Sequence, residues 1–199
     1  MTMPAKPRIV GLGGTLRERS YSRAALKETL RLAEARDAET ELLDLRELDL
    51  PMYVPDLPVE GYLPQHQAAI KRLLDSCRRA NAMLWASPTY HGTVSGVFKN
   101  ALDMIELLCD DEPPYLAGRA VGLIVVSDSN TFATMSNAAS ELRAWLAPTY
   151  LTFEKDDFNA DLTLKGGRPA RRASRLVGDL LSFTTAERLN GHRRLPQSH

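Results

Sequence analysis

Residues 8–22, RIVGLGGTLRERSYS, are the stretch of sequence that decides the fold. The first five residues, Arg8 to Leu12, form the short apolar run expected of a central parallel strand, and Gly13-Gly14 interrupts that run. A segment with helical periodicity then begins near Tyr21. The stretch therefore predicts a strand, a glycine turn and a helix in direct succession.

The turn carries groups that suit a phosphate ligand. Hydroxyls and positive charges alternate along it, in Thr15, Arg17, Arg19, Ser20 and Ser22. The N-terminus of the following helix would point free N–H groups into the same space. A second interpretation stays open, because hydroxyls at a helix start often act only as N-caps and loop arginines are often only solvated.

Two familiar phosphate-binding motifs do not fit this turn. The motif G-x-x-x-x-G-K-[ST] requires a Gly-Lys-Ser/Thr sequence, which occurs nowhere in the chain. The dinucleotide motif G-x-G-x-x-G would place its third glycine at Leu16, where a side chain obstructs the close approach of helix and strand. A terminal monophosphate fits the turn better than either ligand.

The whole chain has the size and charge of one globular domain. Its 199 residues suffice for one sizeable core, so we expect a single domain over residues 1–190 and a disordered basic tail over residues 191–199. The 25 basic and 25 acidic residues cancel, which argues against nucleic acid or an anionic membrane as the principal partner.

The cysteines and the apolar runs bear on metal binding and location. Cys77 and Cys109 belong to no C-x-x-C pair or ligand cluster, so we expect reduced thiols and no metal. No apolar run approaches the roughly 18 residues of a membrane span, and residues 1–7 lack the apolar core of a signal peptide. We therefore expect a cytoplasmic protein.

Apolar runs alternate with helical segments along the chain. Strands are predicted over residues 8–12, 40–45, 82–87, 120–126 and 149–153. Helices are predicted over residues 21–35, 63–79, 97–108, from about 131 to Leu146, and 170–188, whereas residues 46–64 with their four prolines are expected to form a long loop. This alternation predicts an α/β fold, a doubly wound five-stranded parallel sheet of order 2-1-3-4-5.

Ligands of such sheets bind at the carboxyl ends of the strands, where three polar loops are expected to meet. The first is the turn after residue 12. The second runs from Pro88 to Gly96 and contains Tyr90 and His91. The third, residues 127–131, follows the strongest strand.

Two of these loops resemble those of a known family, the NAD(P)H-dependent FMN reductases of the flavodoxin-like superfamily, which includes quinone, chromate and azo-dye reductases. GGTLRERSYS at residues 13–22 is similar to the family's G-S-x-R-x-x-S phosphate loop. SPTYHGTVSGVFKNALD at residues 87–103 is similar to its more specific S-P-x-Y-x-x-x-x-x-G-x-x-K-N-x-x-D segment. The resemblance covers roughly residues 8–146 and implies a flavodoxin-like fold.

The resemblance also implies which residues bind the cofactor. In the first loop, Thr15, Arg17, Ser20 and Ser22 would hold the FMN phosphate. In the second, Pro88, Thr89, Tyr90 and His91 would line the isoalloxazine ring and the ribityl chain. Ser127 is expected to contribute from the third loop, where many members of the family have a glycine-rich sequence instead.

Other polar residues near these loops are given structural or open roles. Asp128 could accept a hydrogen bond from the flavin N3–H or cap the next helix. Lys99, Asn100 and Asp103 match the family motif and are expected to fix the second loop by side-chain hydrogen bonds. His91 is read as a hydrogen-bonding residue, and no catalytic residue is predicted, because hydride transfer to a flavin needs no protein base.

The implied function is an FMN-dependent oxidoreductase. NAD(P)H, with NADPH favoured over NADH by the family alone, would reduce bound FMN, and a small electron acceptor such as free flavin or a quinone would follow in a ping-pong mechanism. A homodimer or homotetramer is expected to assemble across residues 97–109. The alternatives are a flavodoxin-like electron carrier with a protein partner and no nicotinamide site, and a phosphate-binding module without redox activity.

Overall fold

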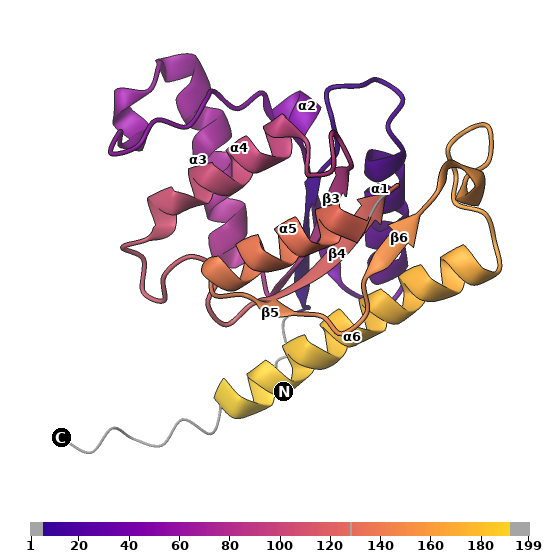
Figure 1. The fold of residues 1–199 in the computed structure, drawn as a ribbon. Coiled ribbons are helices and arrows are strands. Elements are labelled where there is room, and N and C mark those ends of the chain that lie inside the picture. Colours follow the sequence, from indigo (N-terminus) through magenta and orange to yellow (C-terminus); the bar gives the residue numbers. More distant parts are fainter. Residues whose placement is uncertain (1–5, 128, 192–199) are drawn as a thin grey trace.

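The computed structural model describes residues 6–127 and 129–191, which form a parallel sheet with helices on both faces (Figure 1). The strand β1 (Arg8–Gly13) lies between β2 (Glu39–Asp44) and β3 (Ala82–Pro88), and β4 (Ala120–Val126) follows β3. All of these pairings are parallel, and the order β2-β1-β3-β4-β5 confirms the predicted flavodoxin-like sheet.

The helices divide the core into two layers. On one face lie α1 (Tyr21–Glu34) and α6 (Arg168–Gly191), and on the other α3 (Pro64–Arg79), α4 (Gly96–Met104) and α5 (Ser129–Glu141). Successive residues of β4 point to opposite layers: Val125 packs in the layer with α3, α4 and α5, whereas Ile124 and Val126 pack in the layer with α1 and α6. Burial on both faces explains why this strand is apolar at every position.

The predicted fifth strand is two short strands along one edge of the sheet. The strand β5 (Trp145–Leu146) pairs with the first half of β4, and β6 (Leu151–Phe153) pairs with its second half. The prediction of one strand over residues 149–153 therefore found only β6. The two residues of β5 are exposed and were wrongly assigned to the preceding helix.

That helix, α5, ends at Glu141 because the chain turns into the left-handed region at Arg143, where φ is 61°. The amide of Arg143 donates to the Ser140 carbonyl, and the amide of Ala144 donates to the Ala139 carbonyl, each at 2.9 Å. This pair of bonds is a Schellman C-cap, which usually has glycine at the position of Arg143. The helical periodicity through Leu146 therefore misled the prediction.

The loop predicted over residues 46–64 contains two short helical turns, α2 (Leu45–Leu48) and the 3-10 helix η1 (Val59–Gly61). Asp44 ends β2 and caps α2, because its Oδ1 accepts a hydrogen bond of 3.1 Å from the amide of Arg46. Two further 3-10 helices, η2 (Ile105–Leu108) and η3 (Lys155–Asp157), lie outside this loop. The expectation of no regular element in this loop was wrong.

The C-terminal helix is longer than predicted. It begins at Arg168 and continues to Gly191, so that the first residue of the predicted disordered tail is helical. The rest of that tail, residues 192–199, lies outside the described residues. Among the described helices, none combines the length and the apolar character needed to cross a membrane.

The apolar stripe of the predicted helix 97–108 is used within the chain itself. Its buried members, among them Phe98, Leu102, Met104 and Leu108, all belong to the core layer beneath α3 and α5. The stripe thus requires no second subunit. Asn100 has a structural role, but not at the loop of residues 88–96 that it was predicted to fix. Its side chain instead holds the loop after β2, accepting from the amide of Tyr53 and donating to the carbonyl of Pro51, each at 2.8 Å.

Lys99 and Asp103 pair with each other along α4 at 2.5 Å.

Both cysteines are free thiols. Cys77 is fully buried in the core, and burial raises the pKa of its thiol to about 12, whereas Cys109 is exposed.

Candidate functional site

The three polar loops at the carboxyl ends of the strands are called rim loops here. The first of them leaves β1 in close contact with β3. A side chain at Gly13 would collide with the carbonyl oxygen of Ala86 in β3, and the amide of Gly14 donates to that same oxygen at 3.1 Å. Gly14 has a φ of 100°, which favours glycine. The two glycines therefore bring the first rim loop directly beside the loop that follows β3.

Arg23, one turn into α1, holds the first loop in shape. Its guanidinium donates to the carbonyl oxygens of Thr15 at 3.0 Å and Glu18 at 2.9 Å, and its Nε lies 2.5 Å from Asp44 Oδ2. The side chains of Arg23 and Asp44 are 11% and 3% exposed, so the ion pair is buried. The sequence analysis did not single out Arg23, because nothing in the local pattern separates it from a surface helix arginine.

The loop hydroxyls gather at the start of α1. Thr15 Oγ1 accepts a hydrogen bond of 2.9 Å from the amide of Arg17, and Ser20 Oγ accepts one of 3.2 Å from the amide of Arg23. The hydroxyls of Ser20 and Ser22 lie 3.1 Å apart, and all three hydroxyl side chains are buried. Ser20 is thus an N-cap, and it also faces the cavity described below.

The second rim loop is a tight turn. Tyr90 and Thr93 exchange backbone hydrogen bonds of 2.8 and 3.2 Å, and the residues between them, His91 and Gly92, have φ values of 51° and 79°. Two left-handed residues in succession are typical of a type I′ turn. His91 is exposed at the tip of this turn.

The third rim loop begins at Ser127, which is exposed and has a φ of 91°. Its amide donates to the carbonyl of Phe153 in β6 at 3.1 Å. Asp128, for which two roles were left open, lies outside the described residues. Thr131 Oγ1 lies 2.8 Å from Thr89 Oγ1, so the second and third loops are joined by a hydroxyl pair.

The three loops surround a cavity of about 280 Å³. Its lining consists of Thr15, Arg17, Arg19, Ser20, Tyr21, Ser22, Pro88, Thr89, Tyr90, Val126, Ser127 and Lys155. Eight of the nine predicted cofactor-binding residues are thereby brought together, and the ninth, His91, does not line the cavity. None of residues 46–64 lines it either, although that loop was considered as a possible wall.

Charge and apolar surface are distributed over this lining in a way that fits FMN. Among the described lining residues there are three cations and no carboxylate, and three hydroxyls, those of Thr15, Ser20 and Ser22, lie near the start of α1. Pro88 at the end of β3, Val126 at the end of β4 and Tyr90 in the second loop provide apolar surface. The guanidinium of Arg17 lies 5.7 Å from the centre of the Tyr90 ring and so links the two parts.

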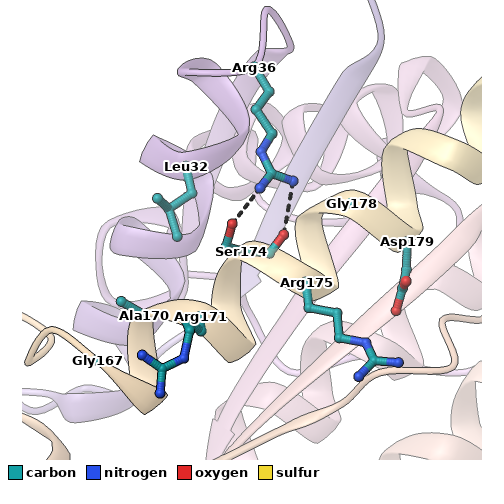
Figure 2. Close-up of a pocket in the computed structure, with 9 residues that line it drawn as sticks. All are labelled: Leu32, Arg36, Gly167, Ala170, Arg171, Ser174, Arg175, Gly178 and Asp179. Atoms are coloured by element: carbon teal, nitrogen blue, oxygen red, sulfur yellow. Dashed lines mark hydrogen bonds between the residues drawn. The ribbon is translucent and has the colours of Figure 1, made fainter.

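A larger hollow of about 790 Å³ lies elsewhere, between α1 and α6 (Figure 2). There Arg36 Nη1 donates to the carbonyl of Ser174 at 2.9 Å, and its other terminal nitrogen donates to the Ser174 hydroxyl. None of the three strand-end loops reaches this groove. Because doubly wound sheets bind ligands at the carboxyl ends of their strands, the smaller cavity is the candidate site.

Four lining residues were not predicted as site residues. Arg19 was noted only for its charge and Val126 only as the end of a strand, whereas Tyr21 and Lys155 were given no role at all. Tyr21 opens α1, and its ring lies 5.2 Å from that of Phe158. Lys155 belongs to the segment after β6, far from both motifs in sequence. No local signal marks it, because its position depends on how that segment crosses the molecule.

Comparison with known proteins agrees with the fold and the motifs. Residues 7–157 match the family described as NADPH-dependent FMN reductase. An NAD(P)H-dependent FMN reductase of Pseudomonas aeruginosa is 35% identical over 96 residues, which is 48% of each protein, so that match spans about half of the relative's length. The NADPH-dependent FMN reductase ArsH of Shigella flexneri is 28% identical over 91% of this chain and 70% of its own.

Among solved structures, the flavoenzyme NAD(P)H:acceptor oxidoreductase FerB from Paracoccus denitrificans superposes with a TM-score of 0.71. The superposition covers 92% of this chain and 99% of FerB, at 22% identity, and thus supports the fold. The family match covers both motifs and confirms the predicted pairing of FMN with NAD(P)H. The chain belongs to the NADPH-dependent FMN reductase family.

Proposed function

We propose that this chain is an oxidoreductase that uses NAD(P)H and FMN to reduce a small acceptor, such as free flavin or a quinone, by a ping-pong mechanism. Bound FMN would supply the redox centre, accepting a hydride and passing on the electrons. The observation that carries the proposal is the cavity at the carboxyl ends of β1, β3 and β4, which is cationic near α1 and apolar near β3.

The phosphate would lie at the start of α1. Thr15, Ser20 and Ser22 bring their hydroxyls there, and the first amides of the helix point the same way. Arg17 has no carboxylate partner among the described residues, and its contact with the Tyr90 ring is of a kind worth only about 0.5–1 kcal/mol at an exposed site. Its charge is therefore readily directed to a phosphate.

The ring system would lie against residues 88–90. The type I′ turn fixes the backbone of this loop, and the amide of Thr89 is already bonded to the Val126 carbonyl at 3.1 Å, which sets the loop against β4. The helix α4 begins at Gly96 behind the loop, and its N-terminus favours negative charge nearby. We assign no protein acid or base, and we place His91 outside the contacts with the ring.

The choice of nicotinamide rests on the family. We place NADPH ahead of NADH, following the family description, and we propose that the nicotinamide and the acceptor use the same face of the cavity in turn. Comparing kcat/KM for the two nicotinamides under identical conditions tests this order. A higher value with NADH would reverse it.

The decisive experiment is anaerobic mixing of the FMN-reconstituted protein with NADPH or NADH while the flavin absorbance near its visible maximum is followed. We expect rapid bleaching, and recovery of the absorbance when a quinone or free flavin is added. Protein that binds FMN but is not bleached by either nicotinamide would favour the flavodoxin-like electron carrier. Protein that takes up no FMN would favour the phosphate-binding module.

A further inference from the structure

The segment between β6 and α6 lies beside the start of α1 (Figure 1). It leaves the sheet beside Ser127, whose amide donates to the carbonyl of Phe153. Five residues further on, Phe158 is buried against Tyr21 at the start of α1. The segment therefore passes from the third rim loop to the first.

Arg19 ties this segment to the phosphate loop. Its Nη2 donates to the carbonyl oxygen of Ala160 at 2.6 Å, across 141 positions of sequence. Together with the contact between Tyr21 and Phe158, this bond fixes the segment near its middle, while the bond from Ser127 fixes its start. Lys155, which lines the cavity, lies between the two attachments.

Lys155 is also the lining cation with the fewest competing contacts. Within the described chain its Nζ forms no ion pair or hydrogen bond, whereas Arg19 is bonded to a carbonyl and Arg17 lies over Tyr90. A phosphate monoester carries a charge of about −1.5 to −2 near neutral pH, which a single arginine does not balance. A lysine acts on such a group as a mobile point charge.

We propose that Lys155 is a further cation of the FMN phosphate site, supplied by the segment after β6 rather than by the phosphate loop, and that Arg19 is a positioning residue that holds this segment through Ala160. The proposal rests on the proposed function, because it assumes FMN as the ligand. It adds a residue that neither sequence motif contains.

The test compares Lys155→Met with Lys165→Met, a change of an exposed lysine in the same segment that does not line the cavity. Dissociation constants of FMN and of riboflavin, which lacks the phosphate, are measured for each protein at low and high salt. We expect Lys155→Met to raise the FMN constant about tenfold at low salt and less at high salt. The riboflavin constant, and both constants of Lys165→Met, should stay unchanged.

Four results would overturn the assignment of Lys155. Equal weakening of FMN and riboflavin would mean that Lys155 acts on the fold or on the ring. Unchanged FMN binding with a raised KM for NADPH would mean that it serves the nicotinamide. Wild-type protein that binds riboflavin and FMN equally would leave no phosphate site at all, whereas wild-type protein that binds neither flavin would also refute the proposed function.

The role of Arg19 is tested by a double-mutant cycle of Arg19→Met and Lys155→Met, read out as the ratio of the FMN and riboflavin constants. If Arg19 acts by holding the segment, the effect of Lys155→Met should shrink clearly in the Arg19→Met background. Additive effects on this ratio would show that Arg19 acts independently of Lys155 and would overturn the positioning role.

Discussion

At the scale of single residues, the candidate site contains cations with different roles, one in ligand binding and one in stabilising the fold. Arg17 is exposed on the phosphate loop and its guanidinium lies over the Tyr90 ring, whereas Arg23 is largely buried and bonded to the loop backbone and to Asp44. Arg17 lies within the motif of residues 13–22, and Arg23 directly follows that motif. The first should matter for the ligand and the second for the fold, and two substitutions separate these roles.

Arg17→Ala should weaken FMN binding and leave the fold intact. A charge-assisted contact with phosphate is worth about 1.5–3 kcal/mol, so we expect the dissociation constant of FMN to rise at least about tenfold. Riboflavin binding and the urea midpoint should not change. The control is Glu18→Ala, which alters the neighbouring side chain that faces a different hollow. Unchanged FMN affinity in Arg17→Ala would reject the phosphate-loop assignment.

Arg23→Met should destabilise the whole domain. The substitution keeps an apolar stem but leaves the Asp44 carboxylate buried without its cation, which typically costs about 3–5 kcal/mol. Urea unfolding followed by circular dichroism measures the loss. The matched control is Arg31→Met in the same helix, where the arginine is 62% exposed and pairs with Glu28, and the change should be about 0.5 kcal/mol or less. Similar losses in the two variants would contradict the structural role of Arg23.

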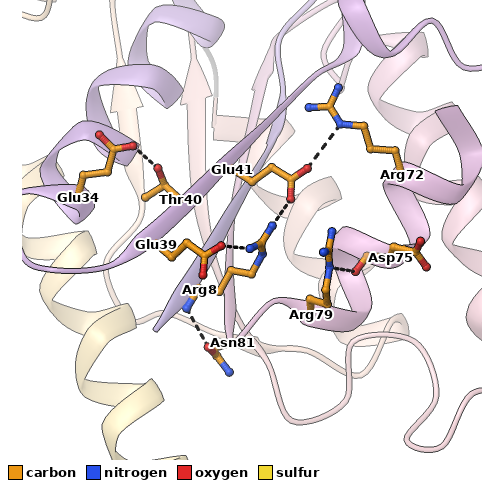
Figure 3. Close-up of polar contacts among 9 residues, drawn as sticks. All are labelled: Arg8, Glu34, Glu39, Thr40, Glu41, Arg72, Asp75, Arg79 and Asn81. Carbon is orange, nitrogen blue, oxygen red and sulfur yellow. Dashed lines mark hydrogen bonds and ion pairs between the residues drawn. The ribbon is translucent and has the colours of Figure 1, made fainter. Parts of the chain in front are cut away.

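At the scale of elements, a chain of ion pairs joins β1, β2 and α3 (Figure 3). Arg8 at the start of β1 binds Glu39 and, at 2.8 Å, Glu41 in β2, and Glu41 lies 3.5 Å from Arg72 in α3. Burial alone would raise the pKa of Glu41, but the hydrogen bond and the charge of Arg8, together with the nearby Ser76 hydroxyl and Arg72 guanidinium, outweigh it, so that the pKa lies below its ordinary value.

Because the pKa of Glu41 is lowered on folding, its contribution to stability is complete above its unfolded pKa of about 4.3 and is lost as pH falls through the lower folded pKa. Glu41→Gln should therefore cost about 1–2 kcal/mol in free energy of unfolding near pH 7 and much less near pH 3. Urea unfolding at both pH values measures this difference. Glu60→Gln, which changes a carboxylate that is 74% exposed, should cost the same at both. A loss from Glu41→Gln that does not depend on pH would refute the expectation.

The sequence predicted elements well where burial alone decides them. The strands β1, β3 and β4 are apolar over most of their length because both faces are covered, and their order followed from the α/β alternation. The end of α5 was missed because Arg143 takes the left-handed position that glycine usually marks. Lys155 was missed because its place in the site follows from packing of Phe158 on Tyr21, which no local pattern encodes.

At the scale of the whole molecule, we expect a homodimer or a homotetramer. The apolar residues of α4 that first suggested an oligomer are buried in the chain's own core. Met52 and Leu63, on the loop after β2, however, expose large apolar side chains to solvent. An interface over this loop would bury them. Sedimentation velocity should give at least a dimer at micromolar concentration, and Met52→Glu with Leu63→Glu should reduce it to monomer. A wild-type monomer would end this expectation.

The last prediction concerns the kinetic mechanism and follows from how many ligands the chain can bind at once. Its three strand-end loops converge on one cavity of about 280 Å³, and the sequence contains no glycine motif of the dinucleotide type that could hold NADPH beside an acceptor. A nicotinamide and an acceptor should therefore occupy the same face in turn. Double-reciprocal plots of rate against NADPH at several low quinone concentrations should be parallel, and quinone at high concentration should compete with NADPH. Intersecting lines, or a quinone that never inhibits against NADPH, would mean that two separate sites are filled together and would overturn the shared face.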